Sequence, residues 1–117
     1  MIDSEFPTSV SQKKANQPAE IWFQRPELDS ILRVYGRMVA AGEWRDYAID
    51  AMKDRAVFSI FRRASEAPTY TVEKRPALAR KQGAYAVINA TGQTLKRGRD
   101  LKTVLKVFDK KRFSVVD

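Results

Sequence analysis

The sequence predicts an α+β domain, because a helical pattern near each end encloses a series of strand-like segments. Large apolar side chains recur three and four positions apart in residues 26–41 and again in residues 101–110. Between these segments the pattern changes to alternation, in short runs at hairpin spacing. We therefore expect an N-terminal amphipathic helix, a four- or five-stranded antiparallel meander and a C-terminal helix, with both helices packed on one face of the sheet.

The first helix is expected from Pro26 to about Ala41. Proline suits the first helical position, and Gly42 suits the position just after the helix. Gly36 lies inside the helix, where glycine costs up to about 1 kcal/mol relative to alanine, so we expect another element to pass close to it. The apolar stripe of this helix consists of Leu28, Ile31, Leu32, Tyr35, Met38 and Val39.

The strands are expected in five alternating segments. One of them is apolar on both faces and should be central. In another, Tyr70 and Val72 should face the core, whereas Glu73 should face solvent. The segment Pro76–Gly83 is either one or two helical turns or an irregular loop. The five predicted strands are residues 44–50, 56–63, 69–74, 84–89 and 93–97.

The remaining boundaries follow from capping and composition. Asp100 can cap a last helix from Leu101 to about Lys110. Residues 1–20 lack any period and are expected to form a disordered N-terminal tail, followed by one α+β domain over residues 21–112 and a C-terminal tail over residues 113–117. The apolar run at residues 21–23 is expected to pack on the core, and the alternative is an exposed patch for a partner.

The composition excludes several classes of site. The 117 residues include no cysteine and no histidine, so thiolate metal sites, disulfides and histidine-based catalysis are excluded. We expect no catalytic residue, no metal and no cofactor, and we expect the protein not to be an enzyme. No apolar run is long enough to span a bilayer, and the first residues do not resemble a secretory signal. A cytoplasmic protein with no membrane partner is therefore expected.

The distribution of charge suggests a binding surface. Residues 1–60 have a net charge of −1, whereas residues 61–117 have a net charge of +9. Such asymmetry is typical of proteins that bind polyanions, although a solvated cationic face gives the same pattern. If the meander brings the strand ends at Arg62, Lys74 and Arg97 together, the cations form one patch. The candidate polyanion-binding residues are Arg62, Arg63, Lys74, Arg75, Arg80, Lys81, Lys96, Arg97, Arg99, Lys102 and Lys106.

A group of acidic residues is the nearest approach to a catalytic constellation. Glu43, Asp46 and Asp50 lie close together in the sequence, and Asp46 and Asp50 could share a strand face. Carboxylate catalysis needs two acids in different environments. Because Arg45 and Arg55 are near, we expect salt bridging rather than an active site.

Four segments carry a resemblance to a known family. They are residues 23–28 (Phe Gln Arg Pro Glu Leu), 34–50, 61–66 and 70–76, and the run Gly Arg Met Val Ala Ala Gly Glu Trp Arg Asp Tyr within the second is the most specific. The chain resembles, from about Trp22 to Lys110, a family of small uncharacterised alphaproteobacterial proteins known only as a domain of unknown function. The resemblance implies a small cytoplasmic bacterial protein, and it transfers no catalytic or binding residue.

Two functional hypotheses therefore stand. The first is a small protein that binds nucleic acid, or another polyanion, or that accompanies nucleic acid as an accessory protein. The second is a protein-interaction module without a nucleic-acid role, which docks an acidic protein or forms a homodimer through residues 21–23 or an exposed sheet edge. The sequence does not decide between a monomer and a homodimer.

Overall fold

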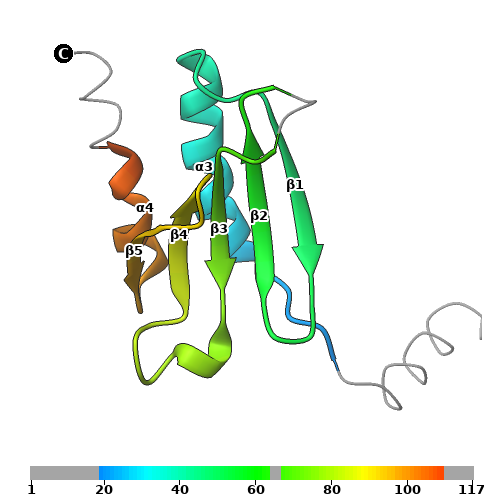
Figure 1. The fold of residues 1–117 in the computed structure, drawn as a ribbon, viewed down its shortest axis with the longest axis vertical. Helices are drawn as coiled ribbons and strands as arrows, with labels where there is room; N and C mark the ends of the chain where they lie inside the picture. Colours follow the sequence, from blue (N-terminus) through cyan, green and yellow to red (C-terminus); the bar gives the residue numbers. More distant parts are fainter. Residues whose placement is uncertain (1–18, 64–66, 110–117) are drawn as a thin grey trace, which may run out of the picture.

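Five antiparallel strands form a meander, and two helices cover one of its faces (Figure 1). The computed structural model describes residues 19–63 and 67–109. Each strand pairs with its neighbours in the sequence, so the order across the sheet is the order along the chain. The predicted fold class is thus confirmed. The strands are β1 (Asp46–Ala51), β2 (Ala56–Phe61), β3 (Tyr70–Lys74), β4 (Tyr85–Asn89) and β5 (Thr94–Gly98).

The helix α3 (Arg25–Ala40) begins and ends at the predicted signals to within a residue. At its start, the backbone N–H of Gln24 donates to the Glu27 carboxylate at 2.6 Å, which satisfies one of the free donors of the first turn. Just beyond its end, Gly42 has a φ of +80°, a conformation that costs glycine little.

Only the residues along the middle of the apolar stripe of α3 pack on the sheet. Ile31 and Met38 are buried, whereas Leu32 and Val39 remain exposed at the side of the helix. The prediction of a close approach at Gly36 is wrong, because a Cβ placed there would meet nothing within 4 Å. Gly36 is therefore a weak point of the helix without a packing reason.

The core lies between the sheet and the two helices. Phe58, Ile60 and Val72 of the sheet are fully buried. An aromatic cluster closes one end of the core, where the ring of Trp44 meets the ring of Phe108 edge to face at 4.8 Å between centroids. The C-terminal segment is thereby fixed to the chain that connects α3 to β1.

Residues 21–23 combine the two predicted arrangements, packing on the core and exposure to solvent. Phe23 is buried at 6% exposure, and Ile21 forms an isolated bridge with Met52, where its N–H donates to the Met52 carbonyl at 2.8 Å. Trp22 between them is 55% exposed. The run therefore packs on the core through its flanking residues and presents the indole ring to solvent.

The helix α4 (Leu101–Leu105) is shorter than the predicted helix, although a further helical turn follows over residues 107–109. Asp100 caps it as expected: its carboxylate accepts from the Thr103 hydroxyl at 2.6 Å and from the Thr103 N–H at 3.1 Å. These hydrogen bonds lower the pKa of Asp100. The predicted helix end at Lys110 and the predicted C-terminal tail at residues 113–117 lie outside the described residues, as does most of the predicted tail at residues 1–20.

The segment between β3 and β4 combines both predicted alternatives. A short 3₁₀ helix, η1 (Pro76–Leu78), is followed by turns that end at Gly83, whose φ is +106°. A Cβ on Gly83 would lie 2.3 Å from the backbone carbon of Gly98. Only glycine allows this loop to lie against the end of β5.

A buried ion pair connects α3 to the sheet. The Lys74 Nζ donates to Glu27 Oε1 at 2.8 Å, and the Tyr85 hydroxyl donates to Glu27 Oε2. The side chains of Lys74 and Glu27 are only 13% and 15% exposed. Burial raises the pKa of Glu27, but the hydrogen bonds from Lys74, Tyr85 and Gln24 outweigh it, so the pKa is lowered from 4.5. Burial, with the nearby Glu27, raises the pKa of Tyr85 to about 12.

The loop contact leads to a first prediction. Gly83→Ala should lower the free energy of unfolding by at least about 3 kcal/mol, because it combines an unfavourable φ with a backbone overlap. Gly92→Ala is the matched control: Gly92 also has a positive φ, +87°, but a Cβ there meets nothing within 4 Å, so about 1 kcal/mol should be lost. Urea denaturation measures both values, and equal losses would contradict the packing argument.

The ion pair leads to a second prediction. Glu27→Gln should destabilise the domain by about 3 kcal/mol at pH 7, because it leaves the Lys74 charge buried without a counter-charge. Since the folded pKa of Glu27 is lowered, its contribution is present above pH 4.5 and is lost as pH falls through the folded value.

The difference in unfolding free energy between the wild-type protein and Glu27→Gln should therefore shrink below pH 4.5. Urea denaturation at a series of pH values measures it. Asp29→Asn is the control, because Asp29 is an exposed carboxylate in the same helix turn. A gap that stays constant down to acid pH would show that folding does not lower the pKa of Glu27.

Candidate polyanion-binding groove

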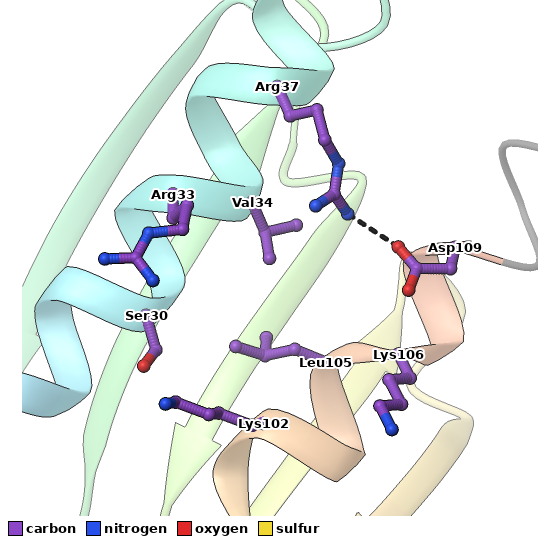
Figure 2. Close-up of a pocket in the computed structure, with 8 residues that line it drawn as sticks. All are labelled: Ser30, Arg33, Val34, Arg37, Lys102, Leu105, Lys106 and Asp109. Atoms are coloured by element: carbon purple, nitrogen blue, oxygen red, sulfur yellow. Dashed lines mark hydrogen bonds and ion pairs between the residues drawn. The ribbon is translucent and has the colours of Figure 1, made fainter.

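A shallow groove of about 200 Å³ separates α3 from the α4 segment (Figure 2). Its floor is apolar, formed by Val34 of α3 and Leu105 of α4. Its rims carry cations from both helices. The lining residues are Ser30, Arg33, Val34, Arg37, Lys102, Leu105, Lys106 and Asp109.

Helix geometry aligns these cations in two rows. Arg33 and Arg37 are four residues apart on α3, and Lys102 and Lys106 are four residues apart on α4 and its C-cap. Residues at this spacing lie on the same helix face, about 6 Å apart along the axis. In Figure 2 the Lys102 side chain extends toward α3 at the level of Ser30. The two rows therefore border the groove from its two helices, on either side of its apolar floor.

One carboxylate offsets four positive charges in this groove. Asp109 accepts from Arg37 Nη2 at 2.6 Å, and both side chains are about half exposed, 49% and 40% respectively. An exposed pair of this kind contributes little to stability, so it can be exchanged for a ligand contact at small cost. The lining therefore has a net charge of +3, and the charges of Lys102 and Lys106 also act on the neighbouring Asp100 carboxylate, whose pKa they help to lower.

A second hollow continues the groove toward the start of both helices. It shares Ser30 and Lys102 with the first, and adds the exposed Arg99 together with Asp100, the cap of α4. Its lining includes Tyr85, whose hydroxyl already donates a hydrogen bond to the Glu27 carboxylate. The lining of this second hollow is neutral overall, because Glu27 and Asp100 balance Arg99 and Lys102, so the excess positive charge of the first groove does not continue into it.

Two of the candidate residues predicted from the sequence lie in this groove, namely Lys102 and Lys106. Lys96 lines a separate hollow on the other side of α4, with Leu95 and Thr103, and Lys106 borders both. The cations of the last helix and of β5 are therefore close neighbours, as the sequence suggested.

Other predicted cations are engaged within the fold. Lys74 is held by Glu27. Arg75 donates to Glu73 at 2.9 Å and to Asp54 at 3.0 Å, and the Glu73 contact raises the pKa of Arg75. Arg97 lies 3.6 Å from Glu73 and donates to the carbonyl of Gly83 at 3.4 Å. These three residues hold the fold together rather than present free charge.

Glu73 lies on the predicted face of the sheet, but the prediction that its side chain is exposed to solvent is wrong. Glu73 is on the sheet face away from the helices, yet it is only 7% exposed. Arg75 and Arg97 cover it, and Arg55 lies 3.7 Å away on the neighbouring strand end. A buried carboxylate needs such partners, and the arginines of three chain segments supply them.

The remaining candidates do not join into one patch. Arg62 and Arg63 follow β2 at the end of the sheet where Phe61 pairs with Asp46. Lys74 and Arg97 lie near the other end of the sheet, where Lys74 pairs with Tyr85 and Tyr85 with Gly98. The idea of a single patch through Arg62, Lys74 and Arg97 is therefore wrong. Arg80 and Lys81 are exposed on the loop after η1, where the Arg80 carbonyl accepts from Arg99 at 3.2 Å.

Sequence reasoning missed Arg33 and Arg37, which form half of the groove. They lie in the half of the chain with a slightly negative net charge, so the distribution of charge along the sequence did not single them out. A signal was available, however. Two amphipathic helices on the same sheet face pack beside one another. The cations that flank their apolar stripes are therefore expected to lie close together.

In the acidic group predicted to form salt bridges, Asp46 and Asp50 lie on the same face of β1. Arg55 pairs with Asp54 and Glu73, and the Asp46 carboxylate accepts from the N–H of Tyr47 at 2.8 Å. Over residues 19–63 and 67–109, no cluster of three or more acidic side chains is arranged to hold a metal ion. In the same part of the chain no helix has the length and apolar character to cross a membrane.

Comparison with known proteins gives a family but no activity. No curated protein and no solved structure matches the chain. One family model matches residues 21–105, which include every helix and strand described above. The chain therefore belongs to the family described as protein of unknown function (DUF2794).

Proposed function

We propose that this domain is a non-enzymatic module that binds the phosphate backbone of nucleic acid, and that the groove between α3 and α4 is its binding site. The observation that carries the proposal is the convergence of Arg33, Arg37, Lys102 and Lys106 on one groove that has a single carboxylate. In the same proposal we assign the protein to the bacterial cytoplasm, on the family resemblance and the absence of cysteine.

The chemistry of the groove suits phosphate. Arginine offers paired N–H donors to phosphate oxygens, and lysine adds mobile point charges. The spacing of about 6 Å within each row suits a polymer that repeats its charge. Each phosphate that the groove neutralises releases counterions, so affinity should fall steeply with salt, with a slope of log affinity against log salt of about −3 to −4 for four contacts.

The groove has no aromatic surface on which bases can stack, because the eight residues that line it include no aromatic side chain. Val34 and Leu105 form the floor and have no polar side-chain atoms. Binding should therefore depend on charge and be similar for RNA and DNA of different sequence.

The proposal leads to a third prediction. The double variant Arg33→Glu and Lys102→Glu should lower affinity for a generic RNA or DNA oligonucleotide by at least about tenfold at low salt, because it reverses one charge in each row. The variant should also have a shallower salt slope. Fluorescence anisotropy with a labelled oligonucleotide, titrated at several salt concentrations, measures both quantities.

The matched control is Arg45→Glu with Lys53→Glu, which changes net charge equally. Both residues are exposed near the ends of β1 and away from the groove. If both double variants lose affinity equally, binding follows net charge and not this groove. If the wild-type protein binds no oligonucleotide at low salt but binds an acidic peptide, the groove serves a protein partner and the proposal fails.

A further inference from the structure

The indole ring of Trp22 is the most exposed large hydrophobic side chain over residues 19–63 and 67–109, at 55%. Its two neighbours in the sequence pack inward, since Phe23 is buried and Ile21 lies against the core. The backbone around the ring is fixed, because the N–H of Ile21 donates to the Met52 carbonyl at 2.8 Å and the Lys74 Nζ donates to the Trp22 carbonyl at 2.9 Å. The fold therefore holds a large aromatic surface in solvent on an ordered segment.

Trp22 lies beside the hollow that continues the groove toward the start of the helices. The Lys74 ammonium that contacts the Trp22 carbonyl also donates to Glu27 Oε1 at 2.8 Å. Glu27 lines that hollow, which shares Ser30 and Lys102 with the groove. One side chain thus bridges the backbone of Trp22 and the wall of the hollow. A ligand that leaves the groove through this hollow reaches the start of α3, next to Trp22.

The length of this path suits a short oligonucleotide. Arg33 in the groove and Arg25 in the first turn of α3 are eight residues apart, or about 12 Å along the helix axis. Successive phosphates of one strand in a duplex are about 3.4 Å apart along its axis. A strand of several nucleotides therefore spans the path from the groove to the start of α3. The exposed Arg25 adds a cation three residues from Trp22 in the sequence.

We propose that Trp22 stacks on a base of a single nucleic-acid strand whose phosphates lie in the groove, so that single strands are the preferred ligand of this domain. The inference rests on the proposed function, because the groove supplies the phosphate contacts. A cationic groove and an aromatic stacking surface are the two components of proteins that bind single strands. A duplex keeps its bases stacked on one another, so an unpaired base is needed to offer its face to the indole ring. Every base has such a face, so stacking does not select a sequence.

The affinities of three probes test the stacking. The probes are a single-stranded oligonucleotide, its duplex with the complementary strand, and an abasic oligonucleotide with as many phosphates as the single strand, each titrated by fluorescence anisotropy at the same low salt concentration. Trp22→Leu should lower the affinity for the single strand at least about fivefold and leave the other two affinities unchanged, because it removes the ring and keeps an apolar side chain. Trp22→Phe is the matched control, since it keeps an aromatic ring and should retain most of the affinity. Circular dichroism checks the fold of both variants.

Tryptophan emission gives a second readout. Trp22 and Trp44 are the two tryptophans of the chain, and Trp44 is buried at 5% exposure. Stacking should quench the emission of Trp22 when the single strand binds, whereas the abasic oligonucleotide should leave the emission unchanged. In Trp22→Phe only Trp44 emits, so the single strand should no longer quench the signal.

Three results would overturn the inference while the groove still binds phosphate. They are a wild-type affinity of Trp22→Leu for the single strand, an equal loss of affinity for all three probes, and an emission that does not change on binding. The equal loss would mean that Trp22 supports the shape of the groove and does not stack.

The double variant Arg33→Glu and Lys102→Glu separates this inference from the proposed function. It should weaken the binding of all three probes, because each of them carries phosphates. If the wild-type protein binds none of the three probes at low salt, the proposed function fails and the inference fails with it. If the double variant weakens binding but Trp22→Leu does not, the inference alone fails.

Discussion

The Glu27 carboxylate is the group on which the arrangement of the domain depends. One of its oxygens receives the N–H of Gln24 and the ammonium of Lys74, and the other receives the hydroxyl of Tyr85. A charge with so little exposure is tolerated only with such partners. The carboxylate therefore ties the start of α3 to β3 and β4 at one point. This contact sets the rotation of the helix about its axis, which turns Ile31 and Met38 inward.

The position of the groove follows from that rotation and from the close approach of α4 to the sheet. With Ile31 and Met38 turned inward, Arg33 and Arg37 are directed along the side of α3 that faces α4. At α4, a Cβ on Gly98 would lie 3.3 Å from a methyl carbon of Val104, so the end of β5 leaves little room between strand and helix. The two rows of cations thus border the groove from its two helices because two unrelated packing constraints fix those helices.

Local patterns were sufficient to predict the elements, whereas the exposure of charged side chains depended on pairing between distant segments. The helix α3, the strand β3 and the Asp100 cap follow from neighbouring residues, and the structure confirms them. The burial of Glu73 depends on Arg55 and Arg97, which lie 18 and 24 residues away and reach it only through the strand register. That register includes an irregularity between Val87 and Ile88, which alternation alone does not reveal.

Net charge along the sequence was therefore an incomplete guide to charge on the surface. Lys74, Arg75 and Arg97 contributed to the basic second half, but the fold pairs them with its own carboxylates. The groove is instead lined by Arg33 and Arg37, which come from the N-terminal half of the chain, where the net charge is negative. Folding has thus separated the cations into those that its own carboxylates neutralise and those that line the groove in excess.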